Sequence, residues 1–165
     1  KRVYGTVSNA AIELLKKFEN PPVDDDGKVG LHLPGDGTIT YGYGIVIGRG
    51  DEISDELRQK YPPMSEEDAT AQLRATVAER ARYVSNKLAN RGLRATQQEF
   101  DAFVLDEYQS GDSSPLMERA QSLETLEELI QLFQRPSTIY PGLLKRREAE
   151  ARVYFEGDYS ENFSY

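Results

Sequence analysis

The chain has 165 residues, contains no cysteine, and carries 28 acidic against 20 basic residues, for a formal net charge of -8. A chain of this length can bury a hydrophobic core without a metal ion or a disulfide to hold it together. The absence of cysteine excludes a disulfide framework, a thiolate zinc site and a cysteine nucleophile. The acidic balance disfavours nucleic acid as a partner, although a local basic cleft could survive. No apolar run approaches the roughly 20 residues of a spanning helix, so we expect no membrane insertion.

The first predicted helix ends at a carboxylate. Ser8 can cap a helix that runs to Glu19, because Pro21-Pro22 prevents its continuation. The apolar stripe of this helix consists of Ile12, Leu15 and Phe18. Glu19 is therefore expected at a helix C-terminus.

A glycine-rich segment follows, from Asp24 to Arg49. Its glycines are interleaved with apolar and aromatic residues, which predicts short antiparallel strands joined by tight turns. Pro34-Gly35-Asp36-Gly37 is the clearest turn.

After this segment the pattern is helical to the end of the chain. We expect four more helices. They run from Ser65 for about 25 residues, from Thr96 to Gly111, from Ser122 through Phe133, and from Pro141-Gly142 to Gly157. We therefore expect an α+β fold, mostly helical, with a small antiparallel β lobe after the first helix and a cleft between lobes. Residues 1–165 are expected to form a single domain, with 1–6 as a linker. The chain begins at Lys1 without a methionine, so we expect a domain cut from a longer polypeptide or, as the alternative, a processed product.

Five pieces of sequence carry the functional argument. In chain order they are Leu15-Lys16-Lys17-Phe18-Glu19, Thr40-Tyr41-Gly42-Tyr43-Gly44, Gln97-Gln98-Glu99-Phe100-Asp101-Ala102-Phe103, Tyr108-Gln109-Ser110-Gly111 and Gly142-Leu143-Leu144-Lys145-Arg146-Arg147-Glu148-Ala149-Glu150. No piece is specific alone, but five in this order at compatible spacing are hard to produce by chance. Over nearly its whole length the chain thus resembles the bacteriophage-type lysozyme family.

The resemblance implies hydrolysis of the β-1,4 bond between N-acetylmuramic acid and N-acetylglucosamine in bacterial peptidoglycan, by an inverting glycosidase without a metal or organic cofactor. Glu19 matches the family's catalytic glutamate, which protonates the leaving-group oxygen. Thr40 matches a threonine whose hydroxyl helps hold the attacking water. Gln109 would bind substrate across the cleft. Arg147, or Arg146, would match a basic residue of the last helix, and this match is the loosest.

The second catalytic group is where the sequence departs from the family. Cleavage of an acetal needs a second carboxylate to stabilise the transition state or activate water. The family usually has an aspartate six residues before the threonine, where this chain has Pro34. Asp36 is the nearest acidic candidate, although Asp-Gly is also an ordinary turn dipeptide. Asp26 is a further candidate, and it too can be read as part of a solvated loop.

Three ring-bearing residues of the same region are candidates for substrate binding. His32, the only histidine, falls on a strand of the hairpin, where we expect it to face solvent or hydroxyl groups. A lone histidine cannot make a metal site. Tyr41 and Tyr43 alternate across a strand, so one is expected to stack on sugar and the other to pack inward. Core packing is the more common role for either tyrosine taken singly.

Two alternative functions stay open. A lytic transglycosylase needs only one catalytic carboxylate, and a non-catalytic peptidoglycan-binding domain would keep Glu19 as a relic.

Many cell-wall lysozymes are basic, so the acidic charge favours a delivered or tethered monomer over a free endolysin stored in the host cytoplasm. We expect it to act on the cell wall in the periplasm of a target bacterium. It would belong to a phage tail component or an antibacterial effector, the latter with an immunity protein as partner.

Overall fold

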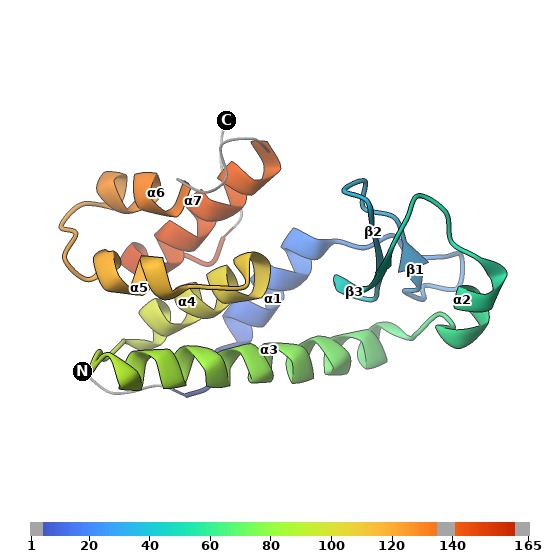
Figure 1. The fold of residues 1–165 in the computed structure, drawn as a ribbon, viewed down its shortest axis with the longest axis horizontal. Helices are drawn as coiled ribbons and strands as arrows, with labels where there is room; N and C mark the ends of the chain where they lie inside the picture. The colour runs from blue at the N-terminus through green and yellow to red at the C-terminus, as the bar shows by residue number, and fades with distance from the viewer. Residues whose placement is uncertain (1–4, 135–140, 161–165) are drawn as a thin grey trace. The chain divides into compact units, whose positions relative to one another are not determined.

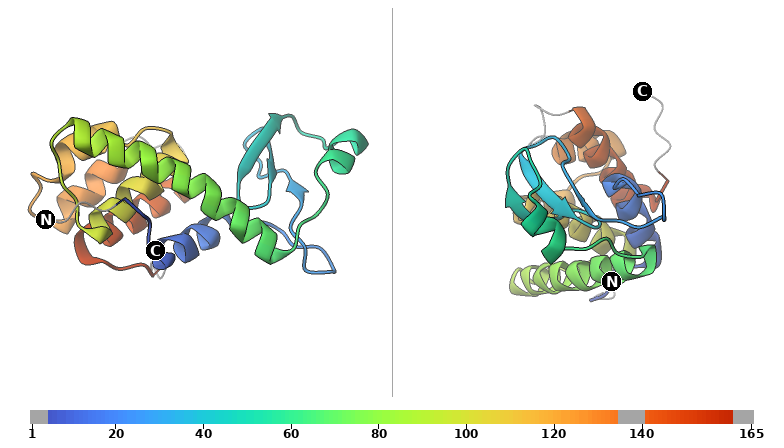
Figure 2. Two further views of the ribbon diagram at one scale, coloured as in Figure 1. Left: turned by 90° about the horizontal axis from the view of Figure 1, so that it is seen from below. Right: turned by 90° about the vertical axis from the view of Figure 1, so that its right-hand side faces the viewer.

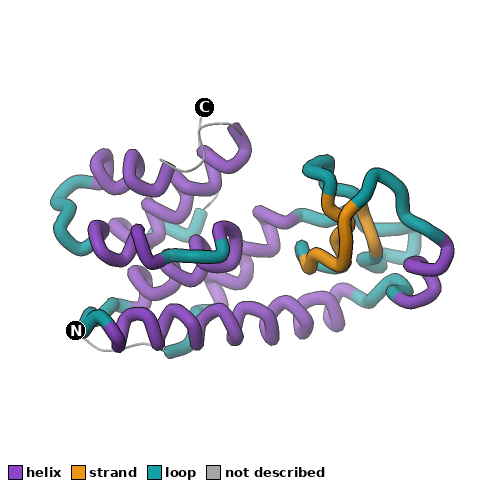
Figure 3. Tube along the Cα trace, in the orientation of Figure 1, coloured by secondary structure: helices purple, strands orange, loops and turns teal. Residues whose placement is uncertain are grey.

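The computed structural model describes residues 5–134 and 141–160. Its elements are α1 (Asn9–Glu19), β1 (Leu31–His32), β2 (Thr38–Tyr41), β3 (Ile45–Arg49), α2 (Asp55–Lys60), α3 (Glu66–Asn90), α4 (Gln97–Ser110), α5 (Ser114–Ala120), α6 (Leu126–Gln134) and α7 (Pro141–Glu156) (Figure 1). The strands are confined to one stretch of the chain, and the remaining elements are helices (Figure 3). The expected α+β composition, with a small antiparallel sheet after the first helix, is confirmed.

The chain divides into two compact units, which we call the helical unit and the sheet unit. The helical unit comprises residues 1–18 and 77–165, and the sheet unit comprises residues 19–76. The division falls at the last residue of α1 and inside α3, which is one unbroken helix of 25 residues (Figure 2). No helix among the described residues has the length and apolar character that crossing a membrane requires.

The sheet unit is built on a three-stranded antiparallel sheet in the order β1-β2-β3. Thr40 of β2 pairs with His32 on one side and with Val46 on the other. A bulge between Ile39 and Thr40 interrupts the register with β3. Bulges of this kind change the direction in which nearby side chains point, and they are common beside active sites.

The long segment between Glu19 and Thr40 is folded into turns that belong to the sheet unit. Val23 and Val29 form an antiparallel bridge, and Val29 forms a second bridge to Met64. The five residues 24–28 thus make a small hairpin of their own outside the main sheet. Val29 is 1% exposed, so this inserted loop is attached to the core of the unit.

In the helical unit, α4 and α6 both pack against α7. Residues on every side of α4 are buried, among them Phe100, Ala102, Phe103, Val104 and Leu105. Tyr154 of α7 meets Phe103 edge-on, with 5.5 Å between ring centroids, and lies 6.4 Å from the ring of Phe133. A helix that is buried on most sides forms the centre of its unit.

The capping residues predicted for three helices are confirmed. The hydroxyl of Ser8 accepts a hydrogen bond from Ala11 N at 3.2 Å, and that of Ser65 accepts one from Asp68 N at 3.1 Å. Thr96 and Glu99 form a reciprocal capping box, and Gly111 ends α4 in the left-handed conformation, at φ 84°. Short polar side chains at these positions satisfy backbone N–H groups that have no partner within the helix.

One predicted helix start is wrong. The helix expected from Ser122 begins at Leu126, and Thr125 caps it by accepting a hydrogen bond from Glu128 N at 3.2 Å. The hydroxyl of Ser122 instead donates to the carbonyl of Arg119 at 2.8 Å, at the end of α5. Ser122 and Thr125 are both residue types that cap helices. Because the hydroxyl of Ser122 is bonded to the preceding helix, Thr125 is the one that caps α6.

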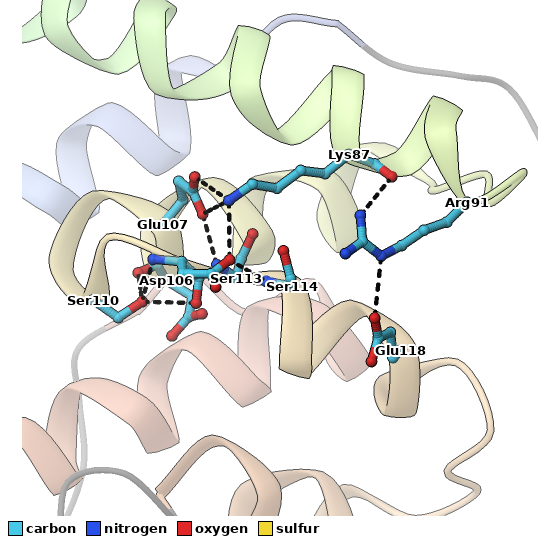
Figure 4. Close-up of polar contacts among 9 residues, drawn as sticks. Lys87, Arg91, Asp106, Glu107, Ser110, Ser113, Ser114 and Glu118 are labelled. Atoms are coloured by element: carbon cyan, nitrogen blue, oxygen red, sulfur yellow. Dashed lines mark hydrogen bonds and ion pairs between the residues drawn. The ribbon is translucent and has the colours of Figure 1, made fainter.

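A polar cluster joins α3 to the turn between α4 and α5 (Figure 4). Lys87 Nζ lies 2.6 Å from Glu107 Oε1 and 3.0 Å from Asp112 Oδ1. Glu107, which is 1% exposed, also accepts a hydrogen bond from Ser113 N at 2.6 Å. A hydrogen bond from the Ser114 hydroxyl is the main cause that lowers the pKa of Asp112 to about 2. The ion pairs of Lys87 and the hydrogen bond from Ser113 N together hold this turn against α3.

Candidate active site

Glu19 is half-buried at the end of α1, with its side chain against the turn between β2 and β3. A Cβ built on Gly44 would lie 2.5 Å from Glu19 Oε2 and 2.9 Å from Glu19 Cδ. Any side chain at position 44 would therefore collide with the carboxylate. Gly44 also has φ +90°, a conformation that residues with a Cβ rarely adopt. The backbone conformation thus favours glycine at position 44, and a side chain there would displace the carboxylate of Glu19.

The chain around Glu19 explains why α1 ends there. Asn20 has φ +28°, and Pro21-Pro22 follows directly. Asparagine tolerates positive φ better than most residues, and the residue before a proline avoids the helical region. The sequence Glu-Asn-Pro-Pro therefore stops the helix with the carboxylate in its last turn, where the chain passes into the sheet unit.

Thr40 is 5% exposed, and its hydroxyl faces the imidazole of His32. Thr40 Oγ1 lies 2.8 Å from His32 Nε2 and 3.4 Å from the carbonyl oxygen of His32. The other ring nitrogen, Nδ1, lies 3.4 Å from the carbonyl oxygen of Gly30. The expectation that His32 faces a hydroxyl group is confirmed, and that hydroxyl belongs to the residue predicted to hold the water.

Asp36 lies in the exposed turn before β2 and binds its own neighbour. Its Oδ1 accepts hydrogen bonds from Thr38 N at 3.0 Å and from Thr38 Oγ1 at 2.5 Å. The bond from the Thr38 hydroxyl is the main cause that lowers the pKa of Asp36. These contacts describe a turn aspartate, which is the ordinary reading of Asp-Gly; a catalytic role for Asp36 stays a prediction.

Asp26 is exposed at the tip of the inserted hairpin. Its backbone N–H and that of Lys28 both donate to Oδ1 of Asp24, at 2.9 Å each. Asp24 thus organises a turn of the kind that aspartate side chains commonly make. The ordinary loop reading fits these contacts, and a catalytic role for Asp26 stays a prediction.

Tyr41 and Tyr43 are each 8% exposed, and the hydroxyl of each makes a hydrogen bond. Tyr41 donates to the carbonyl of Pro62, and its ring meets Tyr61 edge-on with 5.2 Å between centroids. Tyr43 donates to Glu66 Oε1 at 2.9 Å. Packing, the more common role, describes both rings; sugar stacking by either stays a prediction.

Gln109 and Arg147 belong to the helical unit, where they bind one another. Arg147, at 1% exposure, donates through Nη2 to Gln109 Oε1, and through Nη1 to Glu150 and, at 2.6 Å, to Asp106 Oδ1. The burial of Arg147 opposes a direct contact with substrate and favours a structural role. Substrate binding by Gln109 stays a prediction.

Arg146, the alternative match, is also largely buried, at 8% exposure. Its guanidinium lies 4.9 Å from the ring centroid of Phe18, and its Nε lies 3.6 Å from Glu150 Oε1. The two arginines of α7 thus flank one buried carboxylate. Sequence reasoning missed Asp106 and Glu150 as members of this cluster, although the spacing Arg-Arg-x-x-Glu on a helix is a signal for such pairs.

Burial is the first cause that raises the pKa of both carboxylates in this cluster. The pKa of Asp106 rises to about 6 and that of Glu150 to about 7, although Arg147 lowers both. The short contacts to Arg147 favour the ionised form of each carboxylate. Removal from water opposes that form, because two negative charges would then lie close together in a buried site. The charge of Asp106 also raises the pKa of Glu150, and the charge of Glu107 raises that of Asp106, so burial and like charges together outweigh the attraction of Arg147.

These raised pKa values predict how stability depends on pH. Between their unfolded and folded pKa values, from about pH 4 to about pH 7, Asp106 and Glu150 bind more protons in the folded than in the unfolded chain, so their contribution to stability falls as pH rises. Thermal unfolding followed by circular dichroism should show a melting temperature that rises when the pH is lowered from about 7.5 to about 5.5. Glu150→Gln should reduce this rise. An unchanged pH dependence in that variant would show that Glu150 does not titrate in this range.

The described residues contain no group of three or more histidine, cysteine, aspartate or glutamate side chains placed to hold a metal ion. Within the sheet unit, the arrangement consists of one carboxylic acid against the hairpin turn and one hydroxyl bonded to an imidazole in the same hairpin. Such groups can donate a proton and orient water.

Comparison with solved structures identifies the fold. The chain is similar to the endolysin from Escherichia coli O157:H7 phage FAHEc1, with a TM-score of 0.70, 20% sequence identity, and coverage of 94% of this chain and 96% of that one. The expected lysozyme-like fold is thereby confirmed. A search among curated proteins found no match.

The family model for phage lysozyme matches residues 29–150, and the chain belongs to that family. The matched segment includes Thr40, Gln109 and Arg147. Glu19 lies ten residues before it begins, so its assignment depends on the sequence motif and on its position in the structure.

Proposed function

We propose that this protein is a muramidase that hydrolyses the β-1,4 bond between N-acetylmuramic acid and N-acetylglucosamine in bacterial peptidoglycan, with inversion at the anomeric carbon. Glu19 is its general acid, and Thr40 holds the attacking water. Membership of the phage lysozyme family supports a peptidoglycan-cleaving activity. The single observation that supports the site is the contact of the Glu19 carboxylate with Gly44, four residues after Thr40 in the same hairpin.

Glu19 suits the role of acid because its carboxyl group lies against the hairpin turn while its side chain is only half-buried. The absence of a Cβ at Gly44 leaves the space that this carboxyl group occupies. A general acid must reach the leaving oxygen within about 3 Å in the reacting complex. A carboxyl group that lies against the hairpin meets this requirement better than one that points into solvent at a helix end.

Thr40 suits the role of water holder because a hydroxyl can accept and donate at once. Its side chain is held within a strand rather than on a loop, which limits its motion. Inversion needs a water molecule that attacks while the leaving oxygen takes a proton from the acid. Asp36 and Asp26 are not part of this proposal, because their described contacts belong to turns.

The product identifies the reaction. Digestion of purified peptidoglycan in water enriched in oxygen-18 should yield fragments with N-acetylmuramic acid at the new reducing end, each carrying one heavy oxygen, as mass spectrometry would detect. Products with a 1,6-anhydro end would instead show a lytic transglycosylase. Reducing ends on N-acetylglucosamine would place the cleavage at the other glycosidic bond. Binding without any fragments would show a non-catalytic domain.

The biological setting is part of the proposal. A net charge of -8 does not favour encounter with an anionic cell wall, so this activity fits a domain that is carried to its substrate. We propose a catalytic domain of a phage tail component or of an antibacterial effector that acts in the periplasm. An effector of this kind would require an immunity protein in the cell that produces it.

A further inference from the structure

We propose that His32 takes the place of the second carboxylate: its imidazole accepts the hydrogen of the Thr40 hydroxyl and, through that hydroxyl, the proton of the attacking water. His32 is thus the positioning residue of Thr40. This inference rests on the proposed hydrolysis, and it adds the group that activates the water.

The contacts of the imidazole define which nitrogen accepts. The carbonyl oxygen of Gly30, which can only accept a hydrogen bond, lies 3.4 Å from Nδ1. This neighbour favours the neutral tautomer with its hydrogen on Nδ1, in which Nε2 keeps its lone pair. Thr40 Oγ1, at 2.8 Å from Nε2, then donates its hydrogen to the ring. The carbonyl oxygen of His32 is a competing acceptor for this hydrogen, but it is farther away, at 3.4 Å.

The sheet holds this pair in place. His32 and Thr40 are partners in the antiparallel register of β1 and β2, so their side chains lie on the same face of the sheet. Thr40 is 5% exposed and His32 is half-buried. The contact is therefore a consequence of strand pairing rather than of a chance surface rotamer.

The acidic candidates of the same unit do not offer Thr40 a comparable partner in the described contacts. Asp36 accepts hydrogen bonds from Thr38 in the turn, and Asp24 accepts them from the backbone of the inserted hairpin. Glu19 faces Gly44 and serves as the acid. A group that serves as the acid in one step cannot be the base in that same step, so the base must be another residue.

The proton transfers balance. With the hydroxyl hydrogen of Thr40 directed to Nε2, the oxygen of Thr40 can accept a hydrogen bond from water. As the water oxygen forms its bond to the anomeric carbon, the water proton passes to Thr40 Oγ1, and the original hydrogen of Thr40 passes to His32 Nε2. The bond between the anomeric carbon and the leaving oxygen breaks, and that oxygen takes the proton of Glu19. The imidazolium and the Glu19 carboxylate return to their starting states by exchange with solvent.

A matched pair of variants tests this proposal. His32→Gln and His32→Glu both retain an acceptor oxygen for the Thr40 hydroxyl, but only glutamate can take up a proton. Turnover of soluble peptidoglycan fragments by His32→Gln should fall by about 10²-fold or more, with KM within about threefold. His32→Glu should be at least about tenfold faster than His32→Gln. Val46→Ala alters the other cross-strand neighbour of Thr40 and should turn over within about twofold of the unchanged chain.

Azide supplies a second readout, because this nucleophile does not need to lose a proton. Added azide should raise the turnover of His32→Gln and yield a glycosyl azide, while leaving the unchanged chain nearly unaffected. A fall in the melting temperature of His32→Gln with no recovery by azide would show a structural role and overturn the proposal. So would full turnover by His32→Gln, or equal turnover by the Gln and Glu variants. If the unchanged chain cleaves no glycan, the proposed function itself fails.

Discussion

Glu19→Gln is expected to reduce the rate of peptidoglycan clearing by about 10²–10⁴-fold, the usual contribution of a general acid. Glutamine has nearly the shape of glutamate, so it should keep the contact with Gly44 while losing the proton that the leaving oxygen needs. Clearing of a purified peptidoglycan suspension, followed by turbidity, measures this loss. The melting temperature should change little, because the replaced group is only half-buried.

Glu13→Gln provides the matched control for this variant. Glu13 lies on the same helix, its side chain is 60% exposed, and it lies 3.7 Å from Lys16 in a surface ion pair. Such pairs contribute little to stability, so this variant should clear at the rate of the unchanged chain. Equal losses in the two variants would show that the charge of α1, rather than the proton of Glu19, affects the reaction.

Gly44→Ala is expected to reduce turnover by about 10²-fold, because even a shift of about 1 Å at a catalytic group can have such an effect. The added methyl group would occupy the space of the Glu19 carboxylate, which would have to move. The same substitution strains the backbone at φ +90°, at an expected loss of about 1–2 kcal/mol of stability. Turnover and thermal unfolding, measured on the same preparation, report the two effects.

Gly37→Ala separates backbone strain from displacement of the acid. Gly37 has φ +84°, close to the value of Gly44, but a Cβ there would have no atom within 4 Å. Both variants should therefore lose similar stability, while only Gly44→Ala should lose most of its turnover. If Gly37→Ala loses as much activity, strain in the sheet unit explains the effect and the contact with Glu19 does not.

The end of α1 and the caps at Ser8, Ser65 and Thr96 were predictable because their causes are local. Ser8 and Thr96 cap helices through bonds to residues three positions away, and Pro21-Pro22 stops α1 through its own ring geometry. The position of Glu19 at a helix end follows from the same neighbours. Only a pattern over five separated pieces, however, connected that position to a reaction.

The partners of the site residues were not predictable because they depend on strand register and burial. A slip of one residue in β1 would turn His32 away from Thr40, and no local pattern in a strand of two residues fixes its register. The resemblance matched Arg147 or Arg146 to a basic residue of the last helix beside the site, whereas burial places both arginines against Glu150. The short helices α2 and α5 were missed since six or seven residues are too few to show a helical period.

The most direct test of the central claim, that Glu19 donates the proton, compares Glu19→Gln with the unchanged chain on two substrates. One is the natural glycan, and the other is a muramyl oligosaccharide with a nitrophenol leaving group, which departs without protonation. We predict a deficit of about 10²–10⁴-fold on the natural glycan and at most about tenfold on the nitrophenyl substrate. An equal deficit on both substrates would contradict the account, because the lost function could not then be protonation of the leaving oxygen.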